Sequence, residues 1–157
     1  MKKYIYDIES YPNIFTFSYV SDDNSEKRTF EISFRKNEVV ELFSFLDECH
    51  NKRCFLIGFN NVGFDYPVIH KLIKMRNNIP KNGVTIAKKM YQYTQEQIES
   101  FNGDFPNTVK ESERYIQQIG LRTFLFVGMM LHSQAMMGVS THTHGWMQLM
   151  KFGFWRG

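Results

Sequence analysis

The sequence predicts an α/β domain built on a mixed β-sheet with helices against it. In three segments near the N-terminus, apolar and polar residues alternate, which is typical of strands with one covered face. An amphipathic helical pattern follows them, and a short, continuously apolar run comes next. A second helical pattern follows that run.

The N-terminal segments are expected to form an antiparallel meander of three strands, over residues 4–9, 14–21 and 27–34. Side chains alternate across a strand, so Ile5, Asp7 and Glu9 would share one face of the first. The apolar faces of the other two strands would consist of Phe15, Phe17, Tyr19, Phe30, Ile32 and Phe34.

Residues 38–50 are expected to form an amphipathic helix, with Asn37 as its N-cap. The apolar run over residues 54–59 suits a strand that is covered on both faces, as parallel strands are. A further helix is expected to begin near Asp65. Weaker patterns suggest a helix over residues 91–100 and a strand over 114–121.

This order of elements, with the fourth strand returning beside the first, predicts a ribonuclease-H-like sheet: an antiparallel meander plus parallel strands, flanked by helices. The predicted domain covers residues 1–119. Residues 120–157 form a separate, atypical segment, because all 16 acids of the chain lie at or before Glu113. The chain has 43% hydrophobic residues and only two cysteines, which excludes wholesale disorder and a disulfide framework.

Cys49 and Cys54 are expected to be buried thiols, and the absence of an N-terminal signal predicts a cytoplasmic protein. The most apolar window, residues 121–139, contains Arg122 and His132. That interruption argues against a membrane span, so no membrane partner is expected.

Asp7, Glu9 and Asp65 are the candidate functional residues. Two acids on one strand face repel each other unless a cation lies between them, and hard divalent ions prefer carboxylate oxygen. Asp65 follows the apolar run, at the end of a strand where α/β sheets place ligands. The alternatives are that Asp7 and Glu9 face solvent and that Asp65 caps a helix.

Asp7-Ile8-Glu9 resembles the first motif of the DnaQ-like, DEDD-type 3′–5′ exonucleases, and Asn61-Val-Gly-Phe-Asp65 resembles their second motif. The form is closest to the proofreading domains of bacteriophage family B DNA polymerases, which would place the protein in a host cytoplasm. The resemblance covers residues 1–76.

The resemblance implies metal-dependent 3′–5′ hydrolysis of DNA. Asp7, Glu9 and Asp65 would be catalytic residues that hold two Mg²⁺ or Mn²⁺ ions. Asn61 and Phe64 would contact the single-stranded 3′ end, and a polymerase domain or subunit is an implied partner. From the residues alone, Phe64 is equally suited to a core position, and Tyr11 is expected to pack near the site.

The third motif of that family, a Tyr or His followed by a metal-binding Asp, is missing. The only late acids are Asp104, Glu111 and Glu113, and none has the required partner at the required spacing. The chain is therefore interpreted as a domain that is cut short near residue 119, a relative that binds nucleic acid without cutting, or a site completed by a partner. Because one of the two metals would lose a ligand without this Asp, hydrolysis by this chain alone is expected to be feeble.

A run of basic residues follows the second motif and is a candidate contact for a phosphate backbone, with a solvated helix surface as the alternative. Its members are Lys71, Lys74, Arg76, Lys81, Lys88 and Lys89.

Overall fold

The computed structural model describes residues 1–101 and 108–120. By its internal contacts the chain divides between residues 122 and 123, so the described residues all belong to the first unit. The predicted segment over residues 120–157 lies outside the described residues except for Gly120, and so does Asp104.

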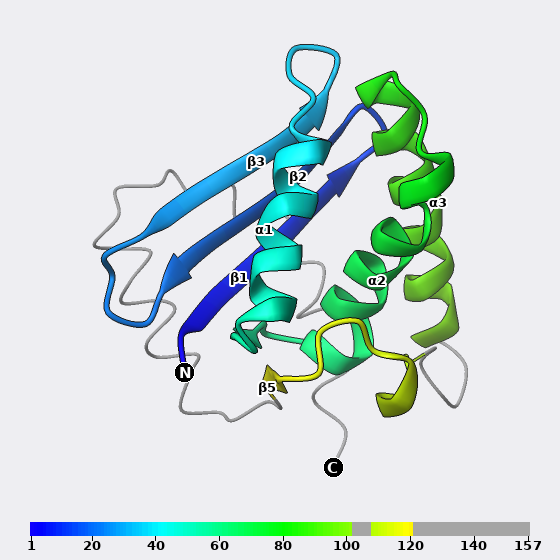
Figure 1. The fold of residues 1–157 in the computed structure, drawn as a ribbon. Helices are drawn as coiled ribbons and strands as arrows, with labels where there is room; N and C mark the ends of the chain where they lie inside the picture. Colours follow the sequence, from blue (N-terminus) through cyan, green and yellow to red (C-terminus); the bar gives the residue numbers. More distant parts are fainter. Residues whose placement is uncertain (102–107, 121–157) are drawn as a thin grey trace. The chain divides into compact units, whose positions relative to one another are not determined.

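The described residues contain a five-stranded mixed sheet with the strand order β3-β2-β1-β4-β5 (Figure 1). Its strands are β1 (Lys3–Tyr11), β2 (Ile14–Ser21), β3 (Lys27–Ser33), β4 (Phe55–Ile57) and β5 (Ile119–Gly120). The first three are antiparallel, whereas β4 runs parallel to β1 and β5 runs parallel to β4. The predicted α/β class, the meander and the return of the fourth strand beside the first are confirmed.

The two faces of the sheet differ in character. Ile8 of β1 pairs with Phe17 of β2, and both side chains are buried. Asp7 pairs with Ser18 on the opposite face, where the Ser18 hydroxyl lies 2.9 Å from that of Thr29 in β3. The alternation predicted for β1, with Ile5, Asp7 and Glu9 on one face, is therefore confirmed.

Helix α1 (Val39–Asn51) packs on the apolar face, and Figure 1 shows it crossing the strands of the meander. Its Phe45 ring stacks on Tyr19 with ring centroids 4.2 Å apart, and it meets the edge of Tyr4 at 5.1 Å. Phe17 lies 5.9 Å from the same ring. Aromatic burial of this size contributes much of the stability of a small domain.

The segment after β3 folds back on the outer edge of that strand. The Glu38 amide donates to the Glu31 carbonyl at 2.9 Å, and the Glu38 carboxylate accepts the Glu31 amide at 3.0 Å. Asn37 is not the N-cap of α1, contrary to prediction, because its side chain donates to the Lys81 carbonyl instead. Phe34 lies beyond the end of β3 and is 91% exposed, so its predicted place on the apolar face is wrong.

The remaining helical elements are a π-helical turn η1 (Asn61–Asp65), α2 (Tyr66–Lys74), the 3-10 turn η2 (Arg76–Asn78), α3 (Gly83–Phe101) and the 3-10 turn η3 (Glu111–Glu113). Helix α3 begins well before the predicted residue 91, because Asn82 Oδ1 accepts the Val84 and Thr85 amides at 2.8 and 3.3 Å. Of the strand predicted over residues 114–121, the structure shows only β5 (Ile119–Gly120).

Cys49 and Cys54 are buried thiols, as predicted. Within residues 1–101 and 108–120, no helix combines the length and the apolar character needed to cross a bilayer.

His70 on α2 is a buried imidazole, 6% exposed, whose two nitrogens have no hydrogen-bond partner among the described residues. Burial and the charge of Lys74 lower the pKa of His70, although Glu113 opposes the shift. The unfolded chain therefore binds this proton more readily, so His70 makes the fold less stable as the pH falls below about 6.5.

The substitution His70→Leu is expected to remove this fall in stability at low pH. In urea unfolding at pH 5.0, the free energy of unfolding of the variant should exceed that of the parent by about 1 kcal/mol, because leucine cannot take up the proton that favours the unfolded chain. The difference in the free energy of unfolding between variant and parent should be smaller at pH 7.5. A gap that is the same at both pH values would contradict the assignment of a buried neutral imidazole.

Candidate functional site

The acidic face of β1 carries the first part of the site. Asp7 and Glu9 alternate with the buried residues Tyr6 and Ile8, so both carboxyl groups leave the strand on the side away from α1. β4 pairs with β1 only as far as Ile5, so these acids lie beyond the C-terminal end of the parallel pair.

The π-helical turn η1 carries Asp65, the second part of the site. The Asp65 carboxylate accepts the Asn60 amide at 3.2 Å and is 6% exposed. Asp65 makes no side-chain cap for α2, so the helix-cap alternative is not supported. A Cβ atom at Gly58 would lie 2.9 Å from Asp65 Oδ2, so a glycine just after β4 leaves room for this carboxylate.

The pKa values of these acids are shifted mainly by burial and, for Asp7, also by its neighbours' charges. Burial raises the pKa of Asp7 to about 8, and the charges of Asp65 and Glu9 add to the shift. Burial likewise raises the pKa of Asp65 to about 7, opposed by the Asn60 amide. Asp7 and Asp65, which lie far apart in the sequence, are therefore close enough to repel each other.

The donor chemistry of this pair fits a divalent cation. Carboxylate oxygens are the ligands that Mg²⁺ and Mn²⁺ prefer, and a cation would relieve the repulsion that raises the Asp7 pKa. In the part of the chain that the structure describes, no group of three or more His, Cys, Asp or Glu side chains is close enough to hold an ion. The described residues thus supply two carboxylates, those of Asp65 and Glu9, whose charges act on Asp7.

Asn61 and Phe64, predicted to contact a DNA strand, lie on η1 between β4 and Asp65. The Asn61 side chain is 3% exposed and hydrogen-bonds to Tyr6 and to the Leu56 carbonyl. Phe64 is partly buried against the apolar core. The contact of these residues with a strand stays a prediction.

Two tyrosines of β1 are part of this region, although sequence reasoning assigned them no role in the chemistry. The Tyr6 hydroxyl donates to Asn61. Tyr11 was expected to pack, but it is 42% exposed, and its hydroxyl donates to Glu9 Oε2 at 3.4 Å. The alternation of β1 places Tyr6 in the core, but its partner on η1 comes from a distant segment.

The run of basic residues from α2 to the first turns of α3 divides into two groups. Arg76 is not available to a phosphate, contrary to prediction, because its guanidinium donates to both carboxylate oxygens of Asp47 at 2.7 and 3.2 Å. The exposed group comprises Lys71, Lys74, Lys81, Lys88 and Lys89. Within it, the Lys71 ammonium lies 5.2 Å from the centre of the Tyr93 ring, which joins α2 to α3.

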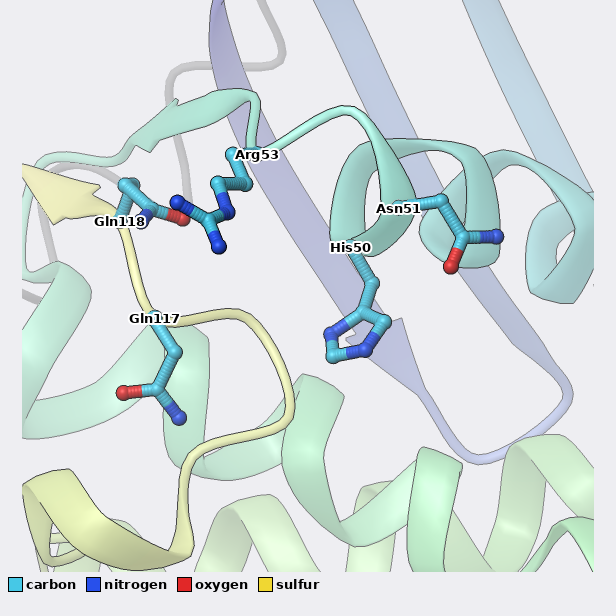
Figure 2. Close-up of a pocket in the computed structure, with 5 residues that line it drawn as sticks. All are labelled: His50, Asn51, Arg53, Gln117 and Gln118. Atoms are coloured by element: carbon cyan, nitrogen blue, oxygen red, sulfur yellow. The ribbon is translucent and has the colours of Figure 1, made fainter.

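A shallow pocket of about 380 Å³ lies where α1 ends and where β4 and β5 begin, at the N-terminal ends of the two parallel strands. Figure 2 shows the His50 and Arg53 side chains pointing into this space, whereas Asn51 points away from it. The other lining residues are Gln117 and Gln118. The pocket thus lies at the opposite end of the parallel strands from Asp7 and Asp65.

No protein-family model matches the chain, and neither a curated protein nor a solved structure matches it. The class of site therefore rests on the residues and their geometry.

Proposed function

We propose that this chain carries a ribonuclease-H-like, metal-dependent 3′–5′ exonuclease domain of the proofreading type, as in phage-like DNA polymerases. The carrying observation is the placement of Asp7 on β1 and of Asp65 at the end of η1, both beyond the C-terminal ends of the parallel strands, where the charge of Asp65 adds to the raised pKa of Asp7. The sheet order and the place of this pair beyond the parallel strands support the proposal.

In the proposed reaction, Asp7, Glu9 and Asp65 would hold Mg²⁺ or Mn²⁺ at the 3′ end of a single DNA strand. The bound ions would activate a water molecule and stabilise the leaving oxygen of the phosphodiester. The exposed lysines of α2 and α3 would attract the phosphate backbone. A polymerase domain or subunit is the proposed partner.

A nuclease assay tests this function. A 5′-labelled single strand should be shortened slowly in Mn²⁺, and the activity should disappear in Asp7→Asn and in Asp65→Asn, because each removes a negatively charged ligand. Asp22→Asn, in the exposed β2–β3 turn, is the matched control and should cleave like the parent. Cleavage that survives both site substitutions would overturn the proposal.

The second candidate is a nucleic-acid-binding module that does not cut. It is favoured by the lack of any acid after Glu113 and by the lack of a three-ligand cluster in the described residues. Such a module should bind the labelled strand equally well in EDTA and in Mn²⁺, and leave it intact. Weak, Asp7-dependent shortening of the strand would exclude it.

A further inference from the structure

Asn61 joins three strands of the sheet through its side chain. Its Nδ2 atom donates to the Leu56 carbonyl of β4 at 2.8 Å and lies 3.5 Å from the Gly120 carbonyl of β5. Its Oδ1 atom accepts the hydroxyl of Tyr6 in β1. Buried amides that satisfy both ends in this way are strong constraints on the backbone that carries them.

Tyr6 is itself fixed by its surroundings. It is 1% exposed, and its ring stacks on Phe17 with centroids 5.0 Å apart and planes inclined by 16°. Its hydroxyl therefore reaches Asn61 from a rigid core position. A strand of nucleic acid cannot reach a side chain that is this deeply buried.

Both residues lie on the same local elements as the two carboxylates. Tyr6 precedes Asp7 in β1, and Asn61 begins the single π-helical turn that ends in Asp65. The Asn60 carbonyl accepts the Phe64 amide at 2.8 Å and the Asp65 amide at 3.3 Å, so the turn is tied back at its own start. The Tyr6–Asn61 hydrogen bond thus connects the two chain segments that supply the acids.

We infer that Tyr6 and Asn61 are positioning residues, which hold η1 against β1 and so set the separation of the Asp7 and Asp65 carboxylates. The inference rests on the proposed function only in what the carboxylates bind. Asn61 then positions the site and does not contact the DNA strand, because the oxygen and nitrogen of its side-chain amide already have partners within the protein.

The test uses the full chain and two variants. Tyr6→Phe removes one hydroxyl group, and Asn61→Ala removes the amide. Tyr4→Phe is the matched control, because Tyr4 lies on the same face of β1, is 3% exposed and donates its hydroxyl to Glu26, away from the site. Circular dichroism and thermal melts establish that each variant is folded.

The first readout is amide hydrogen exchange of residues 58–66 without metal. Exchange there should be about tenfold faster in Tyr6→Phe and in Asn61→Ala than in Tyr4→Phe, because losing one buried hydrogen bond of roughly 1.4 kcal/mol raises local opening tenfold. Equal exchange in Tyr6→Phe and Tyr4→Phe overturns the inference. This readout does not depend on metal binding. If the parent binds no Mn²⁺, the proposed function is contradicted, but the inference about Tyr6 and Asn61 is not.

The second readout is the affinity for Mn²⁺, followed by its electron paramagnetic resonance signal without nucleic acid. Tyr6→Phe and Asn61→Ala should weaken Mn²⁺ binding several-fold and leave binding of a single-stranded oligonucleotide in EDTA unchanged. If Asn61→Ala instead weakens oligonucleotide binding and leaves Mn²⁺ affinity intact, Asn61 is a strand contact and the inference fails.

Discussion

Asp7→Asn is expected to stabilise the metal-free protein at pH 8 by roughly 2 kcal/mol and to abolish its stabilisation by Mn²⁺. The folded chain holds a proton on Asp7 up to a pKa of about 8, whereas an unfolded aspartate ionises near its ordinary value of 3.8. The folded state therefore binds more protons between these values. As a result, the stability of the parent falls as the pH rises through this window.

The amide that replaces the Asp7 carboxylate in this variant carries no charge, so the repulsion from Asp65 and Glu9 disappears. In the parent, by contrast, saturating Mn²⁺ should add about 2.7 kcal/mol at a hundredfold excess over its Kd, and more at higher pH as Asp7 and Asp65 ionise.

Thermal and urea unfolding at pH 5.5 and pH 8, each with EDTA and with Mn²⁺, measure both effects. The Asp22→Asn variant serves as control and should follow the parent under all four conditions. A parent whose stability rises between pH 5.5 and pH 8 in EDTA, while Asp7→Asn shows the same rise, would rule out the buried, repelling pair.

Gly83→Ala is expected to destabilise the domain by about 2–3 kcal/mol and to lower its melting temperature by roughly 5–12 °C. At most helix positions alanine is better than glycine by about 1 kcal/mol. Here the added Cβ would lie 2.3 Å from the Ser33 carbonyl oxygen and 3.1 Å from the Ser33 amide nitrogen. Those are main-chain atoms of β3, so the start of α3 must move away from the sheet.

Thr85→Ala is the control for Gly83→Ala, because Thr85 is exposed in the same turn of α3. Its stability should lie within about 0.5 kcal/mol of the parent. Calorimetry of the three proteins measures the difference directly. A Gly83→Ala protein that melts at or above the temperature of Thr85→Ala would show that α3 does not begin against β3.

The sheet was predictable because the pattern of each long strand is local. Alternation in β1 and β2 is dictated by one covered face. The apolar run that contains the fully buried Leu56 is typical of a strand covered on both faces. The start of α3 was missed because it depends on Asn82 Oδ1, which caps the helix, and on the close approach of Gly83 to Ser33. Both are details of packing that periodicity does not record.

The acids of the candidate site were chosen from the sequence, whereas the residues that support them were not. Asp7 and Asp65 follow from residue type and from their places on a strand and after a strand. Tyr6 reads as an ordinary core aromatic, and its role depends on a hydrogen bond to a residue 55 positions away. Arg76 looked like a free cation, because the sequence does not show that Asp47 of α1 faces it.

The hydrogen bonds between Glu38 and Glu31 at the outer edge of β3 affect whether copies of this chain can associate through that strand. An open edge strand is a template on which an identical chain can add its own strand. The Glu31 amide and carbonyl are already bonded to Glu38, so this half of the β3 edge is closed to such growth. The other half carries the exposed cations Lys27 and Arg28, and charged side chains on an edge strand discourage the addition of another strand. We therefore expect the purified chain to resist sheet-extending self-association through β3, even at high concentration.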